Sequence, residues 1–203
     1  AILATVICLV GATNTLAAEN ADAGIYVLGG AGRLFSNNDQ SDFDNALRSV
    51  GATGFTSSLS NPTIYKFQVG YQVMKYFAVE GGYIGSSNET YSASGGNLAG
   101  PLSASANVNG WNLEAVGIWP IAPQFSLLGK LGVSDLKLSG TVSGPGGSVS
   151  LSSSKTDVTF GVGAKYDFNN NIFVRVDVDR YTIGGGNSSS HTNVWMIDLG
   201  YKF

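Results

Sequence analysis

The sequence is poor in charge, because Asp, Glu, Lys and Arg make up 12% of its 203 residues, about half of the share usual in a soluble domain. It has one cysteine, one histidine and five prolines. The single cysteine, Cys8, excludes an internal disulfide and any metal site built from several thiolates. The net charge of −3 provides no basic surface for nucleic acid.

No apolar run is long enough to cross a bilayer as a helix. The uncharged stretch over residues 1 to about 10 is similar to the apolar core of a secretory signal peptide, and small residues over 15–18 supply cleavage sites. We therefore expect a signal peptide over 1–18 that lacks its basic start, followed by one domain over 19–203. A buried N-terminal helix is the alternative. Cleavage would remove Cys8 and leave a chain without a thiol.

The sequence is rich in glycine, with 28 residues, and apolar residues alternate with polar ones over most of its length. At the C-terminus, one face carries Trp195, Ile197, Leu199, Tyr201 and Phe203. This period of two predicts a β-strand, because a helix would scatter these side chains around its circumference. The same alternation recurs over 65–73, 77–83, 111–119, 125–133, 158–168 and 172–179. With the first apolar segment, 25–35, the sequence predicts eight strands.

The connections between these strands alternate in length. Short turns lie near residue 75, over 120–123 and over 169–170, whereas long polar segments cover 36–62, 86–106, 139–154 and 184–192. In an up-and-down meander, all short turns lie at one end of the sheet and all long loops at the other. The first long segment contains a helical pattern over 41–51, with Ser41 as a cap, Phe43 and Leu47 on one face, and Gly51 at the end.

The polar faces of the strands carry charges of both signs. We expect these side chains to form an interior network: Lys66, Glu80, Glu114, Lys130, Lys165, Arg175, Asp177 and Asp198. Opposite charges satisfy one another inside a barrel, where isolated ions would cost several kcal/mol each. Glycines on the strands, such as Gly70, Gly132, Gly161 and Gly163, leave room for long inward side chains.

The apolar faces are rich in Val, Leu and Phe, with Tyr and Trp near the strand ends, which is typical of a surface that contacts lipid between two aromatic girdles. In lipid, strands must close into a ring that leaves no edge. The sequence thus predicts an all-β fold, an eight-stranded antiparallel up-and-down transmembrane β-barrel with short periplasmic turns and long extracellular loops. A soluble lipocalin-like barrel, with the apolar face around a ligand, is the alternative.

Three segments resemble the OmpA-like outer-membrane β-barrel family: 66–85, 127–133 and the closing DLGYKF over 198–203. The resemblance implies a stand-alone barrel over 19–203 without a peptidoglycan-binding domain, located in the Gram-negative outer membrane. Tyr201 and Phe203 are similar to the C-terminal signal that the barrel assembly machinery reads. The implied partners are outer-membrane lipid, lipopolysaccharide, this machinery and a surface ligand at the long loops, with no nucleic acid.

Three features suggest an enzyme, and each has a structural explanation. The GGAG run within 25–35 resembles a dinucleotide-binding turn, but Phe35 stands where a third small residue is needed and a polar loop follows. We place this segment as the first barrel strand, with Tyr26, Leu28 and Leu34 toward lipid and Arg33 inside. Glu80 and Glu114 are expected to be ion-paired rather than a catalytic pair of carboxylates.

His191 is the only histidine, in the order His191-Thr192-Asn193, whereas barrel lipid A deacylases carry H-x-S on a strand. We expect a solvated loop histidine, no metal site and no cofactor. The favoured function is non-enzymatic, a structural or surface-interaction role in the outer membrane. A narrow channel or conduit for small solutes or hydrophobic molecules is the alternative.

Overall fold

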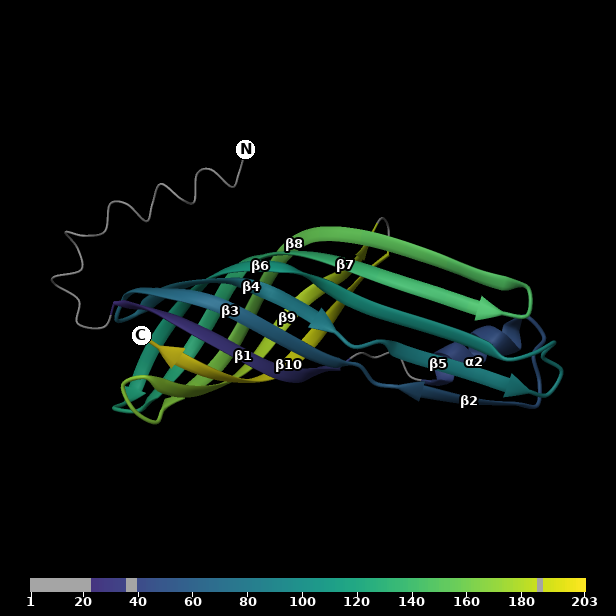
Figure 1. The fold of residues 1–203 in the computed structure, drawn as a ribbon, viewed down its shortest axis with the longest axis horizontal. Helices are drawn as coiled ribbons and strands as arrows, with labels where there is room; N and C mark the ends of the chain where they lie inside the picture. Colours follow the sequence, from purple (N-terminus) through teal and green to yellow (C-terminus); the bar gives the residue numbers. More distant parts are fainter. Residues whose placement is uncertain (1–22, 36–39, 186–187) are drawn as a thin grey trace.

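The computed structural model describes residues 23–35, 40–185 and 188–203 (Figure 1). The expected signal peptide over 1–18 lies outside these residues and stays a prediction. No helix in the described part of the chain is long and apolar enough to cross a membrane.

Eight strands close into an antiparallel ring. In ring order they are β1 (Gly24–Phe35), β3 (Thr63–Met74), β4 (Phe77–Ser86), β6 (Leu102–Ala122), β7 (Phe125–Gly144), β8 (Gly147–Asp167), β9 (Ile172–Gly185) and β10 (Ser188–Lys202). The ring closes where the first and last strands pair, from Tyr26 opposite Lys202 to Phe35 opposite Asn193. The fold is the eight-stranded up-and-down barrel that the alternation predicts.

Strands β6, β7 and β8 are much longer than the barrel needs, at 21, 20 and 21 residues. At about 3.3 Å per residue they reach roughly 65–70 Å, compared with an apolar band of about 25 Å in membrane barrels. Their excess length projects from the end opposite the C-terminus (Figure 1). Two short strands, β5 (Glu89–Gly95) and β2 (Phe55–Ser60), extend the projection beyond β6.

The expectation of loops over 86–106 and 139–154 is therefore wrong in part, since most of these residues form strands. The cause is the composition of the segments. The segments consist mostly of serine, threonine, alanine and glycine, and these small residues alternate with too little contrast in polarity to identify a strand. Residues 184–185 and 188–192 likewise belong to β9 and β10.

The predicted helix is present as α2 (Gln40–Ser49). It ends at Gly51, whose φ of 92° is readily adopted only by glycine. The amides of Gly51 and Ala52 donate to the carbonyls of Arg48 and Leu47 at 3.0 and 3.1 Å. This is the pair of hydrogen bonds of a Schellman motif.

The orientation predicted for the first strand is wrong. Tyr26 and Leu28 are 6% and 1% exposed and point inward, whereas Arg33 is exposed. The side chain of Leu34 lies outside the described residues. Glycine on neighbouring strands explains the inward rings, because a Cβ atom on Gly70 would overlap the ring of Tyr26. Large side chains fill the space that glycine leaves.

The other glycines named above also make room inside the barrel, as predicted. A Cβ atom on Gly132 would meet Glu114 Cγ at 2.7 Å, and Cβ atoms on Gly161 and Gly163 would overlap the carboxylates of the acidic residues opposite them on β9. The barrel can thus enclose long charged side chains because its neighbouring positions carry none.

Candidate functional site

The barrel encloses a layer of buried charged side chains, here called the charge layer. Its members are Lys66, Glu80, Glu114, Lys130, Arg175, Asp177, Asp179 and Asp198. Each is at most 5% exposed. Because side chains alternate between the two faces of a strand, these residues point into the barrel. They come from six strands: β3, β4, β6, β7, β9 and β10. All of the predicted interior charges except Lys165 meet here, and Asp179 joins them.

Arg175 and Glu80 form a forked contact across the layer. Arg175 Nη1 donates to Glu80 Oε1 at 2.6 Å and Nη2 donates to Oε2 at 3.1 Å. The Tyr26 hydroxyl donates to the same Oε1 at 2.5 Å. Such a forked contact fixes both side chains, since two parallel hydrogen bonds define orientation as well as distance.

Two lysines hold the aspartates of β9. Lys130 Nζ lies 2.8 Å from Asp177 Oδ2 and 2.6 Å from Asp179 Oδ1. Lys66 Nζ contacts the same two aspartates at 3.2 and 3.4 Å, and Asp198 Oδ2 at 3.3 Å. Because each lysine bridges several carboxylates, the layer is one connected network.

Glu114 stands at the margin of the network. Gln68 Nε2 donates to its carboxylate at 3.5 Å, while Gln68 Oε1 accepts from Arg175 Nη2 at 3.3 Å. Five carboxyl groups thus surround three cations in the described part of the interior. Each cation therefore balances more than one carboxylate, so losing a cation disturbs the layer more than losing a carboxylate.

Apolar clusters close the charge layer on both sides. Toward the short turns lie Tyr26, Leu28, Ala78, Val116, Leu128 and Phe173. Toward the long strands lie Ile64, Ile84, Leu136, Tyr181, Val194 and Met196. We call these the lower and the upper seal. An ion that crosses the upper seal would have to leave water, since apolar groups offer it no ligands. At the lower seal the apolar cluster shares its cavity with polar and charged side chains: Gln72, Glu80, Lys165, Asp167, Arg175 and Lys202.

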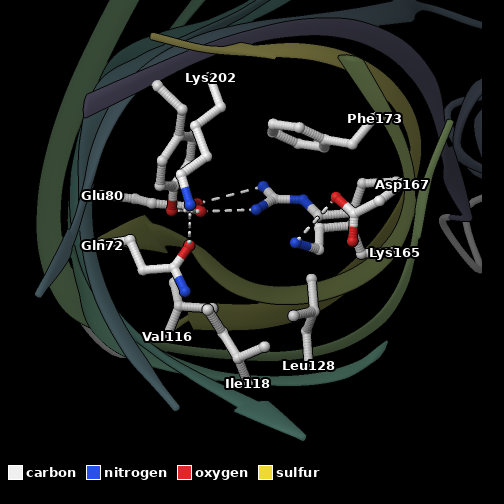
Figure 2. A pocket seen from close by; sticks show the side chains of 11 residues that line it. Gln72, Glu80, Val116, Ile118, Leu128, Lys165, Asp167, Phe173 and Lys202 are labelled. Carbon is white, nitrogen blue, oxygen red and sulfur yellow. Dashed lines mark hydrogen bonds and ion pairs between the residues drawn. The ribbon is translucent and has the colours of Figure 1, made fainter. Parts of the chain in front are cut away.

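Figure 2 looks along the barrel at the region of the lower seal, where side chains converge from the whole wall. The cavity there is about 30 Å³, enough for roughly two water molecules. At its rim, Lys202 Nζ donates to Gln72 Oε1 at 3.5 Å. Lys165 lies at this rim too and pairs with Asp167 at 3.1 Å. It faces the interior opposite Arg175 on β9, as predicted, but its ion pair is with Asp167 and not with a member of the charge layer.

The outer surface of the barrel has two aromatic bands. Toward the projection, Tyr83 packs between Tyr65 and Trp111, with ring centroids 6.4 and 5.3 Å apart. Toward the short turns lie the pairs Tyr166–Phe168 and Tyr201–Phe203. Exposed apolar side chains fill the strip between them: Phe67, Val69, Val79, Leu113, Leu131, Val133, Phe160, Val162, Ile197 and Leu199. This is the surface of a barrel that contacts lipid between interfacial girdles.

Beyond the membrane band, β2, β5, β6, β7 and β8 form a sheet whose inner face is apolar, here called the extracellular sheet. One register row crosses it through Leu59, Tyr91, Ala104, Val142 and Val149. Helix α2 covers the β2–β5 side of this face (Figure 1). A groove of about 210 Å³ remains toward β7 and β8.

The contact of α2 with the sheet is specific. Phe43 stacks on Tyr91 with ring centroids 4.9 Å apart, and the Tyr91 hydroxyl donates to Asp44 Oδ1 at 2.6 Å. This hydrogen bond holds the pKa of Asp44 below its usual value. Burial raises the pKa of Glu89 at the edge of the same face. Gln40 Nε2 also donates to the carbonyl and hydroxyl oxygens of Ser57 on β2, at 2.8 and 2.7 Å. The helix therefore acts as a fixed cover.

The outer face of the extracellular sheet is made almost entirely of hydroxyl-bearing residues, and we call it the hydroxyl face. Its first register row consists of Ser58, Ser92, Ser103, Ser143 and Ser148. Its second consists of Ser60, Thr90, Ser105, Thr141 and Ser150. Neither row was predicted. Alternate hydroxyl residues over 90–94, 102–106, 139–143 and 148–152 were the sequence signal, and they are equally compatible with a loop.

The two carboxylates considered as a catalytic pair belong to the buried charge layer. Glu80 and Glu114 lie opposite each other on β4 and β6 but are enclosed at 0% and 3% exposure, so no substrate reaches them in this conformation. His191 lies on β10 opposite Thr182 rather than in a loop, and its side chain is outside the described residues. No group of His, Cys, Asp and Glu in the described ranges has the arrangement of a metal site.

Comparisons with known proteins agree with this geometry. Residues 3–203 match the family model described as the outer membrane protein beta-barrel domain. The outer membrane protein OprG from Pseudomonas aeruginosa has a similar structure, with 17% identity and a TM-score of 0.55 over 91% of this chain and 98% of that chain. Comparison with curated protein sequences gives no match.

A second similar structure is that of Ail, the attachment invasion locus protein of Yersinia pestis, in complex with the heparin analogue sucrose octasulfate. It has 16% identity and a TM-score of 0.51 over 89% of this chain and 99% of that chain. At these identities the two structures show a shared fold. The family match, the closed ring and the girdled apolar surface together place this chain in the outer membrane protein beta-barrel domain family, as a protein of the Gram-negative outer membrane.

Proposed function

We propose that this protein is a closed, non-enzymatic barrel whose role is to hold the extracellular sheet at the cell surface for contact with other molecules. The observation that carries the proposal is the charge layer between the lower and upper seals. A pore needs a continuous polar path, whereas here apolar side chains from facing strands meet on both sides of the charges. The long parts of β6, β7 and β8 and the docked helix α2 lie outside the membrane band, where they can contact other molecules.

The sulfated ligand of Ail is a poor guide to the ligand of this chain. Sulfate groups are recognised by clusters of Arg and Lys, and the two register rows of the hydroxyl face contain neither. We therefore propose a surface-contact role without a polyanionic partner. For assembly, we propose that the barrel assembly machinery engages β10 through Tyr201 and Phe203, which are 44% and 73% exposed.

A liposome-swelling assay tests the proposal against a narrow channel. We expect vesicles that contain the refolded protein to swell in small neutral solutes no faster than empty vesicles. As a matched pair, Met196→Gly thins the upper seal, and Val142→Gly removes a similar apolar side chain outside the barrel. Rapid swelling with the unmodified protein would contradict a closed barrel and favour the conduit.

A further inference from the structure

The hydroxyl residues of the hydroxyl face lie in regular rows, and solubility alone does not require such a regular arrangement. Its two rows run in register across all five strands of the extracellular sheet. Neighbouring residue positions in these rows are thus about 4.8 Å apart across strands and about 6.7 Å apart along a strand. Within the described part of the chain, the hydroxyls of the first row take part in no side-chain hydrogen bond. They are free to bind an external partner.

The chemistry of the face is also unusual for an exposed sheet. Solvated sheets and their edges normally carry Lys and Glu, which keep them soluble and prevent edge-to-edge pairing. The edge strand β8 has no charged residue over 147–154. A face that avoids charge of either sign but keeps hydrogen-bond donors and acceptors suits an uncharged, polyhydroxylated partner.

The direction of the face indicates where that partner lies. It occupies the same side of β6, β7 and β8 as the lipid-contacting residues Trp111, Val133 and Val158, which lie farther along these strands. The hydroxyl face is therefore a continuation of the membrane-contacting surface. It points sideways, into the layer directly above the surrounding lipids, rather than away from the cell.

We propose that the hydroxyl face binds the uncharged saccharide chains of the outer-leaflet glycolipids that surround the barrel. The inference rests on the proposed surface-contact function and names its partner. Sugar hydroxyls donate and accept hydrogen bonds as the serine and threonine hydroxyls do. The two rows contain no aromatic residue to stack on a single ring, so binding is distributed over many weak contacts along an extended chain.

The test uses the full chain refolded in nanodiscs and, as the probe, the polysaccharide released by mild acid from smooth lipopolysaccharide. The face variant carries Ser92→Ala, Ser103→Ala and Ser143→Ala. The control variant carries Ser41→Ala, Ser49→Ala and Ser153→Ala, which remove as many hydroxyls from α2 and from the inner face. We expect the face variant to bind at least about tenfold more weakly and the control to match the unmodified protein.

A second variant, Ser103→Lys, tests the same row by adding a long charged side chain at its centre, and heat-modifiable gel mobility shows that each barrel is folded. Absence of polysaccharide binding by the unmodified protein would overturn the inference, as would equal losses in the face and control variants. A face variant that abolishes self-association but not polysaccharide binding would assign the face to a second copy and also overturn it. Liposome swelling distinguishes a failure of this inference from a failure of the proposed function. If the barrel is closed but binds no polysaccharide, only the inference is refuted.

Discussion

Replacing Lys130 with methionine should destabilise the barrel more than any single neutralisation of a carboxylate. Lys130 Nζ lies 2.8 Å from Asp177 and 2.6 Å from Asp179, and the residue is 5% exposed. Methionine fills a similar volume, so the change removes charge with little effect on packing. Asp179 would keep only Lys66, at 3.4 Å, whereas Asp177 would keep Lys66 at 3.2 Å and Arg175 Nε at 2.8 Å.

Removing one partner from a buried ion pair typically costs about 3–5 kcal/mol, and we expect a loss in this range in the free energy of unfolding. Glu114→Gln is the matched comparison. Among the described residues its carboxylate has no cation within ion-pair distance and accepts one hydrogen bond, from Gln68 at 3.5 Å. Its neutralisation should cost less than about 1 kcal/mol.

The measurement is urea unfolding of the protein refolded in lipid vesicles, followed by tryptophan fluorescence. The double variant Lys130→Met/Asp179→Asn should recover at least about 1 kcal/mol relative to Lys130→Met, because it removes a carboxylate that has lost the nearer of its two counter-ions. Equal losses for Lys130→Met and Glu114→Gln, or no recovery in the double variant, would refute the connected charge layer.

Three further predictions concern other parts of the fold. Gly70→Val should destabilise the barrel by about 1–3 kcal/mol in the same assay, because the added side chain overlaps the ring of Tyr26. Gly51→Ala, at a φ of 92°, should loosen α2 by about 1 kcal/mol, seen as faster amide exchange in the helix with unchanged exchange in the barrel. The pKa of Asp44 is lowered in the folded state, so helix docking is favoured above the usual carboxyl pKa and weakens as the pH falls through the lowered value. Tyr91→Phe should raise the pKa of Asp44 toward its usual value in an NMR titration and remove this pH dependence; an unchanged titration would contradict the hydrogen bond.

The sequence predicts the barrel and most of its charged interior because period-two alternation links each residue's position to a face. Lys66, Glu80 and Arg175 could be placed inside by counting alone, since large apolar residues alternate with them. Assigning residues to faces by alternation fails in β1, where glycine occupies several positions and neither face is clearly apolar. Tyr26 and Leu28 were assigned to lipid there, although glycines on neighbouring strands give them space inside.

The extracellular sheet could not be predicted for a different reason. Small residues predominate in its strands, and neighbours such as Ser103 and Ala104 differ too little in polarity to give a clear alternation. Their pairing depends on register with β5 and β7, which is set by residues far away in the sequence. The position of Lys165 at the barrel rim depends in the same way on where β8 ends, which alternation does not define.

The most direct test of the closed charge layer is the conductance of the refolded protein in planar bilayers. We predict no single-channel steps for the unmodified protein, and the appearance of steps when Met196→Gly and Leu128→Gly thin the two seals together. Steady ion conductance by the unmodified protein would contradict the proposal of a closed barrel, because ions would then pass both apolar clusters.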